Sequence, residues 1–196
     1  MELREPAIAY SHRKMSIEDY LVFENEASEK HEYYQGDVFA MSGAKVTHNK
    51  IVVNTIGSIH HFLKGKTCKP YNSDQRVYVE KNSLFTYPDI SIFCDKIITR
   101  NNDDMNAMNP AVIIEVLSPG TRIYDQGLKF RLYRAIDTLK EFILMDSEMV
   151  GIEAFSINQN GLWELREYKS IGETLLIQTI HMEIPLQDIY EGTKLL

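Results

Sequence analysis

The sequence predicts a mixed α/β (α+β) fold, in which a mixed central β-sheet is flanked by helices and carries an additional β-hairpin. β-branched, strand-like runs such as 111–117 alternate with segments of helical periodicity. The order strand, helix, strand over 111–145 predicts a parallel pair joined by a right-handed crossover. Residues 151–157 and 162–168 flank Asn160-Gly161, a dipeptide typical of hairpin turns. These observations together favour helices packed on a mixed sheet.

The first forty residues predict an arm, a helix and a hairpin. Residues 1–14 are polar and aperiodic, which indicates an N-terminal arm. The hydroxyl of Ser16 can accept a hydrogen bond from a free N–H at a helix start, so we expect Ser16 to cap a helix over about 17–29. Residues 32–41 form the hairpin, with its turn near Gly36-Asp37.

The remaining elements follow from periodicity and from turn residues. Thr47 is expected to cap a helix that runs to about Leu63, and the Asn/Asp-rich stretch 100–110 is expected to be a loop. Pro185 marks a helix start near the C-terminus. The other expected elements are strands near 67–71, 75–80, 88–94, 111–117 and 141–145, and a helix over about 123–137. Because no linker divides the chain, residues 15–196 are expected to form a single domain.

Composition restricts the class of protein. The chain has 196 residues, 44% of them hydrophobic and 25% charged, which is ordinary for one globular domain. Its net charge of −7 does not predict general nucleic-acid binding, so DNA contact would need a local basic stripe or a bound metal. Cys68 and Cys94 lie in unrelated segments without a CxxC pair, which argues against a zinc knuckle and for a reducing compartment. Without a membrane-length apolar run or a signal-peptide core, we expect a cytoplasmic protein with no membrane association.

Two acids in strand-like runs are the strongest functional indication. Asp89 follows Pro88 at the start of one run, and Glu115 lies inside another. A buried acid is costly unless it is paired, and two carboxylates at the ends of adjacent strands suit a hard divalent cation. The alternative is a solvated strand-end Asp89 and a paired core Glu115. With Asp125-x-x-x-Lys129 just beyond, the combination favours a metal site.

These motifs resemble the Uma2 family. They are Pro88-Asp89, the strand end from Glu115 to Pro119, Asp125-x-x-x-Lys129-x-x-x-Tyr133 and the strand from Leu139 to Leu144. The resemblance covers about residues 15–190 and is most specific over 110–146. It implies a restriction endonuclease-like fold of the PD-(D/E)xK nuclease superfamily.

The resemblance implies roles for five residues. Asp89, Glu115 and a backbone carbonyl near Val116 would bind Mg²⁺ or Mn²⁺, which would activate a water against a phosphodiester. The superfamily lysine is missing, because Leu117 stands two residues after Glu115, and Lys129 is the natural substitute. Glu32 matches an additional acid of the pattern.

Each of these roles has a structural alternative. Lys129 could be only the i,i+4 salt-bridge partner of Asp125. Glu32 could be a surface acid at a hairpin edge. His48 could approach the metal or be a polar residue at a helix start, and Tyr133 is expected to face the core and to steady Lys129. Asp74-Gln75-Arg76 could line the cleft or form a structural turn.

Two functions remain open at this stage. The first is a metal-dependent endonuclease that hydrolyses DNA with a PD…ExL…K variant of the site. The second is a non-catalytic relative of that fold, which serves as a nucleic-acid-binding or assembly module. The resemblance and the C-terminal hairpin also suggest a homodimer, since two symmetric sites are the simplest way to cut both strands of a duplex.

Overall fold

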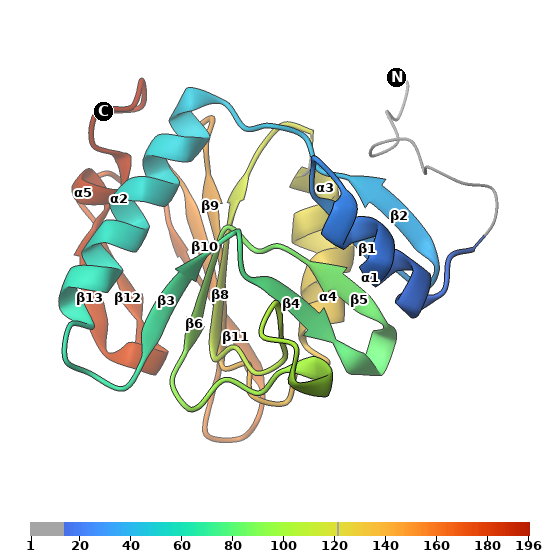
Figure 1. The fold of residues 1–196 in the computed structure, drawn as a ribbon. Helices are drawn as coiled ribbons and strands as arrows, with labels where there is room; N and C mark the ends of the chain where they lie inside the picture. The colour runs from blue at the N-terminus through green and yellow to red at the C-terminus, as the bar shows by residue number, and fades with distance from the viewer. Residues whose placement is uncertain (1–13, 121) are drawn as a thin grey trace.

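The computed structural model describes residues 14–120 and 122–196, so the predicted N-terminal arm lies outside the described residues except for Lys14. The described chain is organised around a six-stranded sheet, a five-stranded sheet and a two-stranded sheet (Figure 1). No described helix is long and apolar enough to cross a membrane.

The five-stranded sheet has the order β2-β1-β5-β4-β7, with α1 beside it. Its elements are α1 (Ile17–Glu26), β1 (His31–Tyr34), β2 (Asp37–Ala40), β4 (Arg76–Val79), β5 (Leu84–Thr86) and β7 (Asn106–Ala107). The Ser16 side chain accepts from the N–H of Asp19, which confirms the predicted cap, although the helix ends at Glu26. The predicted hairpin is confirmed as β1 and β2, and the turn between them places Gly36 at a positive φ of 94°.

The six-stranded sheet has the order β11-β10-β9-β8-β6-β3. Its strands are β3 (Lys69–Asn72), β6 (Ile90–Phe93), β8 (Val112–Leu117), β9 (Glu141–Asp146), β10 (Ile152–Ile157) and β11 (Trp163–Tyr168). β8 and β9 are parallel, and the other neighbours are antiparallel, as the sequence predicted for a mixed sheet. The hairpin around Asn160-Gly161 is confirmed as β10 and β11.

Apolar layers cover both faces of this sheet. On one face lie α2 (Val46–Phe62), the two-stranded sheet of β12 (Thr174–Ile177) and β13 (Met182–Pro185), and α5 (Leu186–Tyr190). On the other face the segment from α3 to α4 packs against Phe142 and Leu144 of β9. The prediction of Thr47 as a cap was wrong, because α2 begins at Val46 after Lys45. The strands β5, β7, β12 and β13 were not predicted. Each has four residues or fewer, which is too short for a reliable pattern.

The helix expected over 123–137 is interrupted and ends early. It consists of α3 (Arg122–Tyr124), a π-helical turn η3 (Asp125–Lys129) and α4 (Phe130–Tyr133). A π-turn inserts extra residues into the helical repeat and is found frequently at functional sites. Gly127, a poor helix former, lies in its middle. The turn leaves Asp125, Lys129 and Tyr133 all buried.

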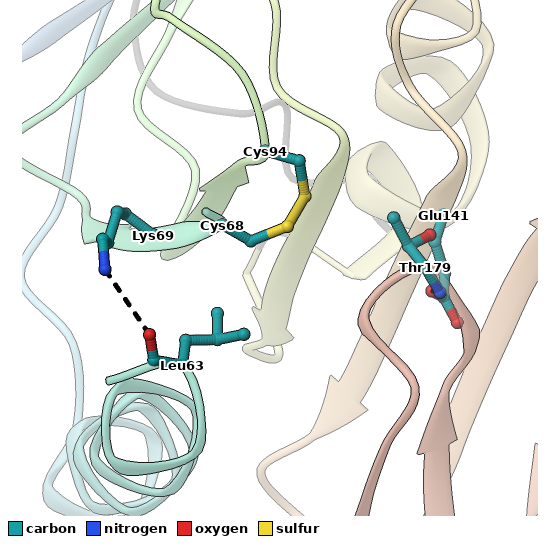
Figure 2. Close-up of a disulfide and its surroundings, with 6 residues drawn as sticks. All are labelled: Leu63, Cys68, Lys69, Cys94, Glu141 and Thr179. Atoms are coloured by element: carbon teal, nitrogen blue, oxygen red, sulfur yellow. Dashed lines mark hydrogen bonds between the residues drawn. A yellow bond between two sulfur atoms is a disulfide. The ribbon is translucent and has the colours of Figure 1, made fainter. Parts of the chain in front are cut away.

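Cys68 and Cys94 form a disulfide (Figure 2). They are brought together because the antiparallel register of β3 and β6 pairs Lys69 with Phe93, which places the two cysteines opposite each other at the next position. The sequence interpretation of two unrelated cysteines was therefore wrong. The expectation of a reducing compartment depended on that interpretation and loses its support.

The chain passes from one sheet to the other through Tyr87, Pro88 and Asp89, the three residues between β5 and β6. β5 belongs to the five-stranded sheet and β6 to the six-stranded sheet. The Pro-Asp dipeptide therefore lies at the junction of the two sheets, where side chains from both can meet.

Candidate functional site

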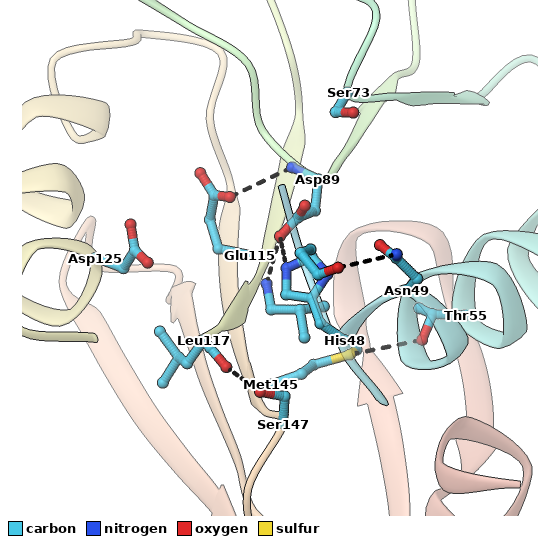
Figure 3. A network of polar contacts seen from close by, with 12 residues as sticks. His48, Asn49, Thr55, Ser73, Asp89, Glu115, Leu117, Asp125, Met145 and Ser147 are labelled. Atoms are coloured by element: carbon cyan, nitrogen blue, oxygen red, sulfur yellow. Dashed lines mark hydrogen bonds and ion pairs between the residues drawn. The ribbon is translucent and has the colours of Figure 1, made fainter. Parts of the chain in front are cut away.

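Asp89 and Glu115 lie opposite each other on neighbouring strands, as predicted. The β6–β8 register pairs Ile90 with Ile114, so the next residues along each strand are Asp89 and Glu115. The Asp89 N–H donates to Glu115 Oε2 at 3.3 Å, and the Val116 N–H donates to Asp89 Oδ2 at 2.8 Å (Figure 3). The two carboxylates are therefore adjacent at one end of the sheet.

Pro88 explains why the side of β8 that faces β6 lacks a ladder hydrogen bond at Val116. Extending the register by one more position brings Pro88 opposite Val116. Proline has no N–H, so Pro88 cannot donate to the Val116 carbonyl in the ladder. The N–H and C=O of a strand residue point to the same side. The Val116 carbonyl therefore faces the side on which its own N–H binds Asp89.

Lys129 is buried among three carboxylates from different elements. Its Nζ lies 2.9 Å from Glu115 Oε1, 3.1 Å from Glu32 Oε1 of β1, and 3.6 Å from Asp125 Oδ1 of the π-turn. The i,i+4 pair with Asp125 exists, but it is the longest of the three contacts. The interpretation of Lys129 as only a local salt-bridge partner is therefore incomplete.

Two hydroxyl groups connect these acids. The Tyr133 hydroxyl donates to Glu115 Oε1 at 2.8 Å and lies 3.1 Å from Thr86 Oγ1. Thr86 Oγ1 in turn donates to Glu32 Oε1 at 2.5 Å. Tyr133 was expected to face the core, and it is fully buried. Sequence reasoning missed Thr86, because a threonine inside a strand is the ordinary choice for that structure.

His48 of α2 reaches the same site from the other face of the sheet. Its Nε2 lies 3.3 Å from Asp89 Oδ2, while its buried Nδ1 has no hydrogen-bond partner among the described residues. Burial disfavours the charged imidazole, but the hydrogen bond and charge of Asp89 raise the pKa of His48 above its usual value. Asp89 thus accepts from His48 and from the Val116 backbone together.

The electrostatics of the site favour an additional cation. Burial raises the pKa of Glu115 to about 8; the charges of Asp89 and Asp125 act in the same direction, and Lys129 opposes them. Burial also disfavours the charge of Lys129, yet the carboxylates of Glu115 and Glu32 hold the pKa of Lys129 well above its usual value. One ammonium group therefore faces more carboxylates than it can neutralise.

The donor set fits a hard divalent ion in part. Carboxylate and carbonyl oxygens are the ligands that Mg²⁺ prefers, and the Asp89 side chain is 21% exposed. Glu115, however, is turned toward Lys129 and Tyr133. Among the described residues, no three His, Cys, Asp or Glu side chains are grouped so as to hold a metal ion.

Asp74-Gln75-Arg76 does not join this site. Asp74 is exposed and pairs with Lys30 at 2.7 Å. Arg76 is 1% exposed and donates to Asn106 Oδ1 and to the Tyr87 hydroxyl. The interpretation as a structural element fits these contacts better than a cleft-lining role.

The mixed α+β architecture, with mixed sheets flanked by helices, matches a solved structure that is described as a putative nuclease. The fold is shared with the crystal structure of "a putative nuclease belonging to DUF820" from Anabaena variabilis, at a TM-score of 0.70 and 16% identity over 90% of this chain and 97% of that one. The chain belongs to the Uma2 family, described as "Putative restriction endonuclease", whose model matches residues 17–187.

Two curated relatives come from Synechocystis sp. strain PCC 6803. The protein slr1290 is 33% identical over 179 residues, which cover 91% of this chain and 93% of the relative. The protein sll1609 is 28% identical over 170 residues, which cover 87% and 95%. The similarity therefore extends over nearly the whole chain, including the segments that carry Asp89, Glu115 and Lys129.

Proposed function

We propose that this protein is a metal-dependent endonuclease that hydrolyses phosphodiester bonds of DNA. The observation that carries this proposal is the pair of opposed carboxylates, Asp89 and Glu115, with the buried Lys129 beside them. A surplus of carboxylates in a buried position is costly unless a cation compensates it. The membership of a family described as a putative restriction endonuclease supports the same conclusion.

Each residue has a distinct task in this proposal. Asp89, Glu115 and the Val116 carbonyl would hold Mg²⁺ or Mn²⁺. The bound ion would polarise the phosphodiester and lower the pKa of a coordinated water. Lys129 would orient the attacking water in place of the lysine that is absent at Leu117, and Glu32 would hold the Lys129 ammonium. The Tyr133 hydroxyl fixes one oxygen of Glu115.

The proposed substrate and assembly follow from charge and symmetry. Because the net charge of the chain is −7, attraction of a polyanion would depend on the ion and on local cations. Cleavage of both strands of a duplex is most simply achieved by two copies related by a twofold axis. We therefore include a homodimer in the proposal.

A non-catalytic binding or assembly module is the second candidate. Two observations favour it. Leu117 occupies the position of the superfamily lysine, and Glu115 is already bound by Lys129 and Tyr133. In this alternative the buried ionic cluster only stabilises the junction between the two sheets.

Cleavage of supercoiled plasmid and of single-stranded DNA with Mg²⁺ or Mn²⁺ separates the two functions. Asp89→Ala and Glu115→Ala should abolish cleavage together with the rise in Tm that Mn²⁺ gives the native protein. Lys129→Ala should bind Mn²⁺ but cut about 100-fold more slowly, the usual scale for a positioned acid–base group. Lys129→Arg should rescue poorly, because guanidinium is bulkier and does not release its proton.

Lys140→Ala is the matched control, since Lys140 is an exposed lysine near the same helix. It should cut at the wild-type rate. Equal cleavage by wild type and Glu115→Ala would refute the proposed site. A folded wild-type protein that neither binds Mn²⁺ nor cuts DNA would leave the binding module as the better explanation.

A further inference from the structure

The two edges of the six-stranded sheet are protected to different degrees. The edge strand β3 is four residues long and carries Lys69 and Pro70, both typical of edges that avoid pairing. The opposite edge strand, β11, is six residues long and contains neither lysine nor proline. Its four central side chains are exposed. β11 is therefore the edge that is open to a further strand.

The hydrogen-bond pattern shows which groups point away from the sheet. The Asn158 N–H donates to the Leu162 carbonyl at 2.9 Å, so Leu162 is bonded toward β10. Antiparallel ladders alternate, so Glu164 and Arg166 also bond toward β10. The N–H and C=O groups of Trp163, Leu165 and Glu167 therefore point outward, where no described strand pairs with them.

The sequence of β11 is complementary to itself in the antiparallel direction. We propose that two copies of this chain associate by antiparallel pairing of β11 with β11, around a twofold axis at Leu165. Leu165 would then form a hydrogen-bonded pair with Leu165 of the second copy. Glu164 would lie opposite Arg166 of the second copy, and Arg166 opposite its Glu164. Each of these pairs would be non-hydrogen-bonded, the class in which side chains come closest.

The same register covers apolar surface. Leu162 is 63% exposed and Leu165 is 49% exposed in one copy. In the pair, Leu162 would lie opposite the half-buried Tyr168 of the second copy, and the two Leu165 side chains would meet. A shift of the register by two residues would lose both charged pairs. Register is therefore specified by charge as well as by apolar contact.

Charges on an edge strand usually discourage pairing. Here the acid and the base lie symmetrically about Leu165, so a second copy in this register meets opposite charge at both positions. A strand that lacks an acid and a base at this spacing would meet an unmatched Glu164 or Arg166. The surface therefore favours its own copy over such strands, and the twofold interface is of the isologous kind. This inference does not depend on the proposed nuclease activity.

Charge reversal with light scattering tests the pairing. Glu164→Arg places arginine opposite arginine, and Arg166→Glu places glutamate opposite glutamate, so each variant should be monomeric where the wild type is dimeric. An equimolar mixture of the two variants restores both opposite-charge pairs and should form a heterodimer. Glu183→Arg, a reversal on the exposed side of β13, is the matched control and should remain dimeric.

Leu165→Lys is a second test, because the charge of Arg166 also acts on the buried Glu141 and its reversal could disturb folding. This variant places two ammonium groups at the axis and should be a folded monomer by circular dichroism. A monomeric wild type, or a Leu165→Lys variant that stays dimeric, would overturn the proposal. Failure of the two charge variants to associate when mixed would overturn the assigned register.

Discussion

Two buried ionic clusters among the described residues can be compared, and the strand-end cluster is the one of the two with the properties of a reactive site. The strand-end cluster lies at the junction of the two sheets, and the α1 cluster lies between α1 and the five-stranded sheet. Their members are Glu32, Asp89, Glu115, Asp125 and Lys129 in the strand-end cluster, and Glu24, His31, Arg76 and Tyr87 in the α1 cluster.

The α1 cluster is closed to solvent, and both oxygens of its carboxylate, Glu24, are bound by residues of the cluster. Glu24 accepts from the His31 backbone at 2.9 Å and from the Tyr87 hydroxyl at 2.6 Å, and it contacts His31 Nδ1 at 3.0 Å. Arg76 binds the other side of the Tyr87 hydroxyl and lies among aromatic rings. Its one carboxylate, Glu24, is linked to Arg76 through the Tyr87 hydroxyl, and all four side chains are shielded from solvent.

The strand-end cluster differs from the α1 cluster in its ratio of positive to negative groups and in its exposure to solvent. Its single ammonium group contacts three carboxylates, and a fourth, Asp89, keeps 21% of its side chain exposed. Burial of charge is therefore not sufficient to identify a site. Surplus negative charge with one exposed carboxylate distinguishes a cluster that can take a cation from one that stabilises the fold.

Substitution of Glu24 in the α1 cluster should give a large loss of stability without an effect on the strand-end cluster. Glu24→Ala leaves Arg76 buried without a carboxylate in its network, and breaking one partner of a buried ionic group costs about 3–5 kcal/mol. The free energy of unfolding, measured with urea, should fall by this amount. Cleavage per folded molecule should not change.

Glu26→Ala provides the comparison, since Glu26 is exposed on the same helix, and its unfolding free energy should stay within about 0.5 kcal/mol of wild type. If Glu24→Ala abolished cleavage while the protein remained folded, the α1 cluster would also belong to the reactive site, and the distinction between the two clusters would be wrong.

The strand-end cluster should make stability depend on pH through Glu115. In the folded protein burial raises the pKa of Glu115 to about 8, above its ordinary value of 4.5. Between these values the folded state holds a proton that the unfolded chain releases. The Glu115 proton therefore contributes its full stabilisation to the free energy of unfolding below pH 4.5. This stabilisation, a few kcal/mol in all, is lost as pH rises through 8.

Urea unfolding of metal-free protein between pH 5 and pH 9 measures this slope. Glu115→Gln carries no titrating group at this position, so its stability should vary less over the same range. Identical slopes in the two proteins would show that Glu115 does not titrate in this way.

The sequence predicted the strands that carry Asp89 and Glu115 better than it predicted the side-chain contacts around them. The β-branched runs in the sequence predicted the strands β6 and β8. These strands are antiparallel neighbours, and their pairing places Asp89 beside Glu115. Such a prediction succeeds because strand periodicity is local and register follows from it.

What the sequence could not predict depends on contacts between distant segments. Thr86 and Tyr133 meet only because β5 and α4 pack at the junction of the sheets. The π-turn changes which residues share a side of the helix, and no pattern of apolar spacing indicated it. Cys68 and Cys94 became partners through the β3–β6 register, which was not assigned from the sequence.

His48 should act on the strand-end cluster through Asp89. Its Nε2 lies 3.3 Å from Asp89 Oδ2, so His48→Ala removes one of the two groups that fix this carboxylate. We expect cleavage to slow by about 10-fold, equivalent to roughly 1.4 kcal/mol, which is near the lower limit for a hydrogen bond to a charged group. The loss should be in kcat, and His48→Gln should recover part of it because an amide can still donate.

His61 lies on the same helix and is exposed, so His61→Ala should leave kcat unchanged. A His48→Ala protein that cuts as fast as the wild type would exclude His48 from the strand-end cluster.

Asp125 should have the smallest effect of the acids in this cluster. Its contact with Lys129 Nζ, 3.6 Å, is longer than those of Glu115 and Glu32. Asp125→Asn keeps the shape of the side chain and leaves the other two contacts to hold the ammonium. Urea unfolding should show a smaller loss of stability than Lys129→Ala gives. Cleavage should stay within about threefold of wild type, since 1.36 kcal/mol corresponds to a tenfold change in rate. Lys129→Ala, measured in parallel, should slow cleavage far more. If both variants lost cleavage equally, Lys129 would be acting together with Asp125, and the π-turn itself would have to be placed in the reactive part of the cluster.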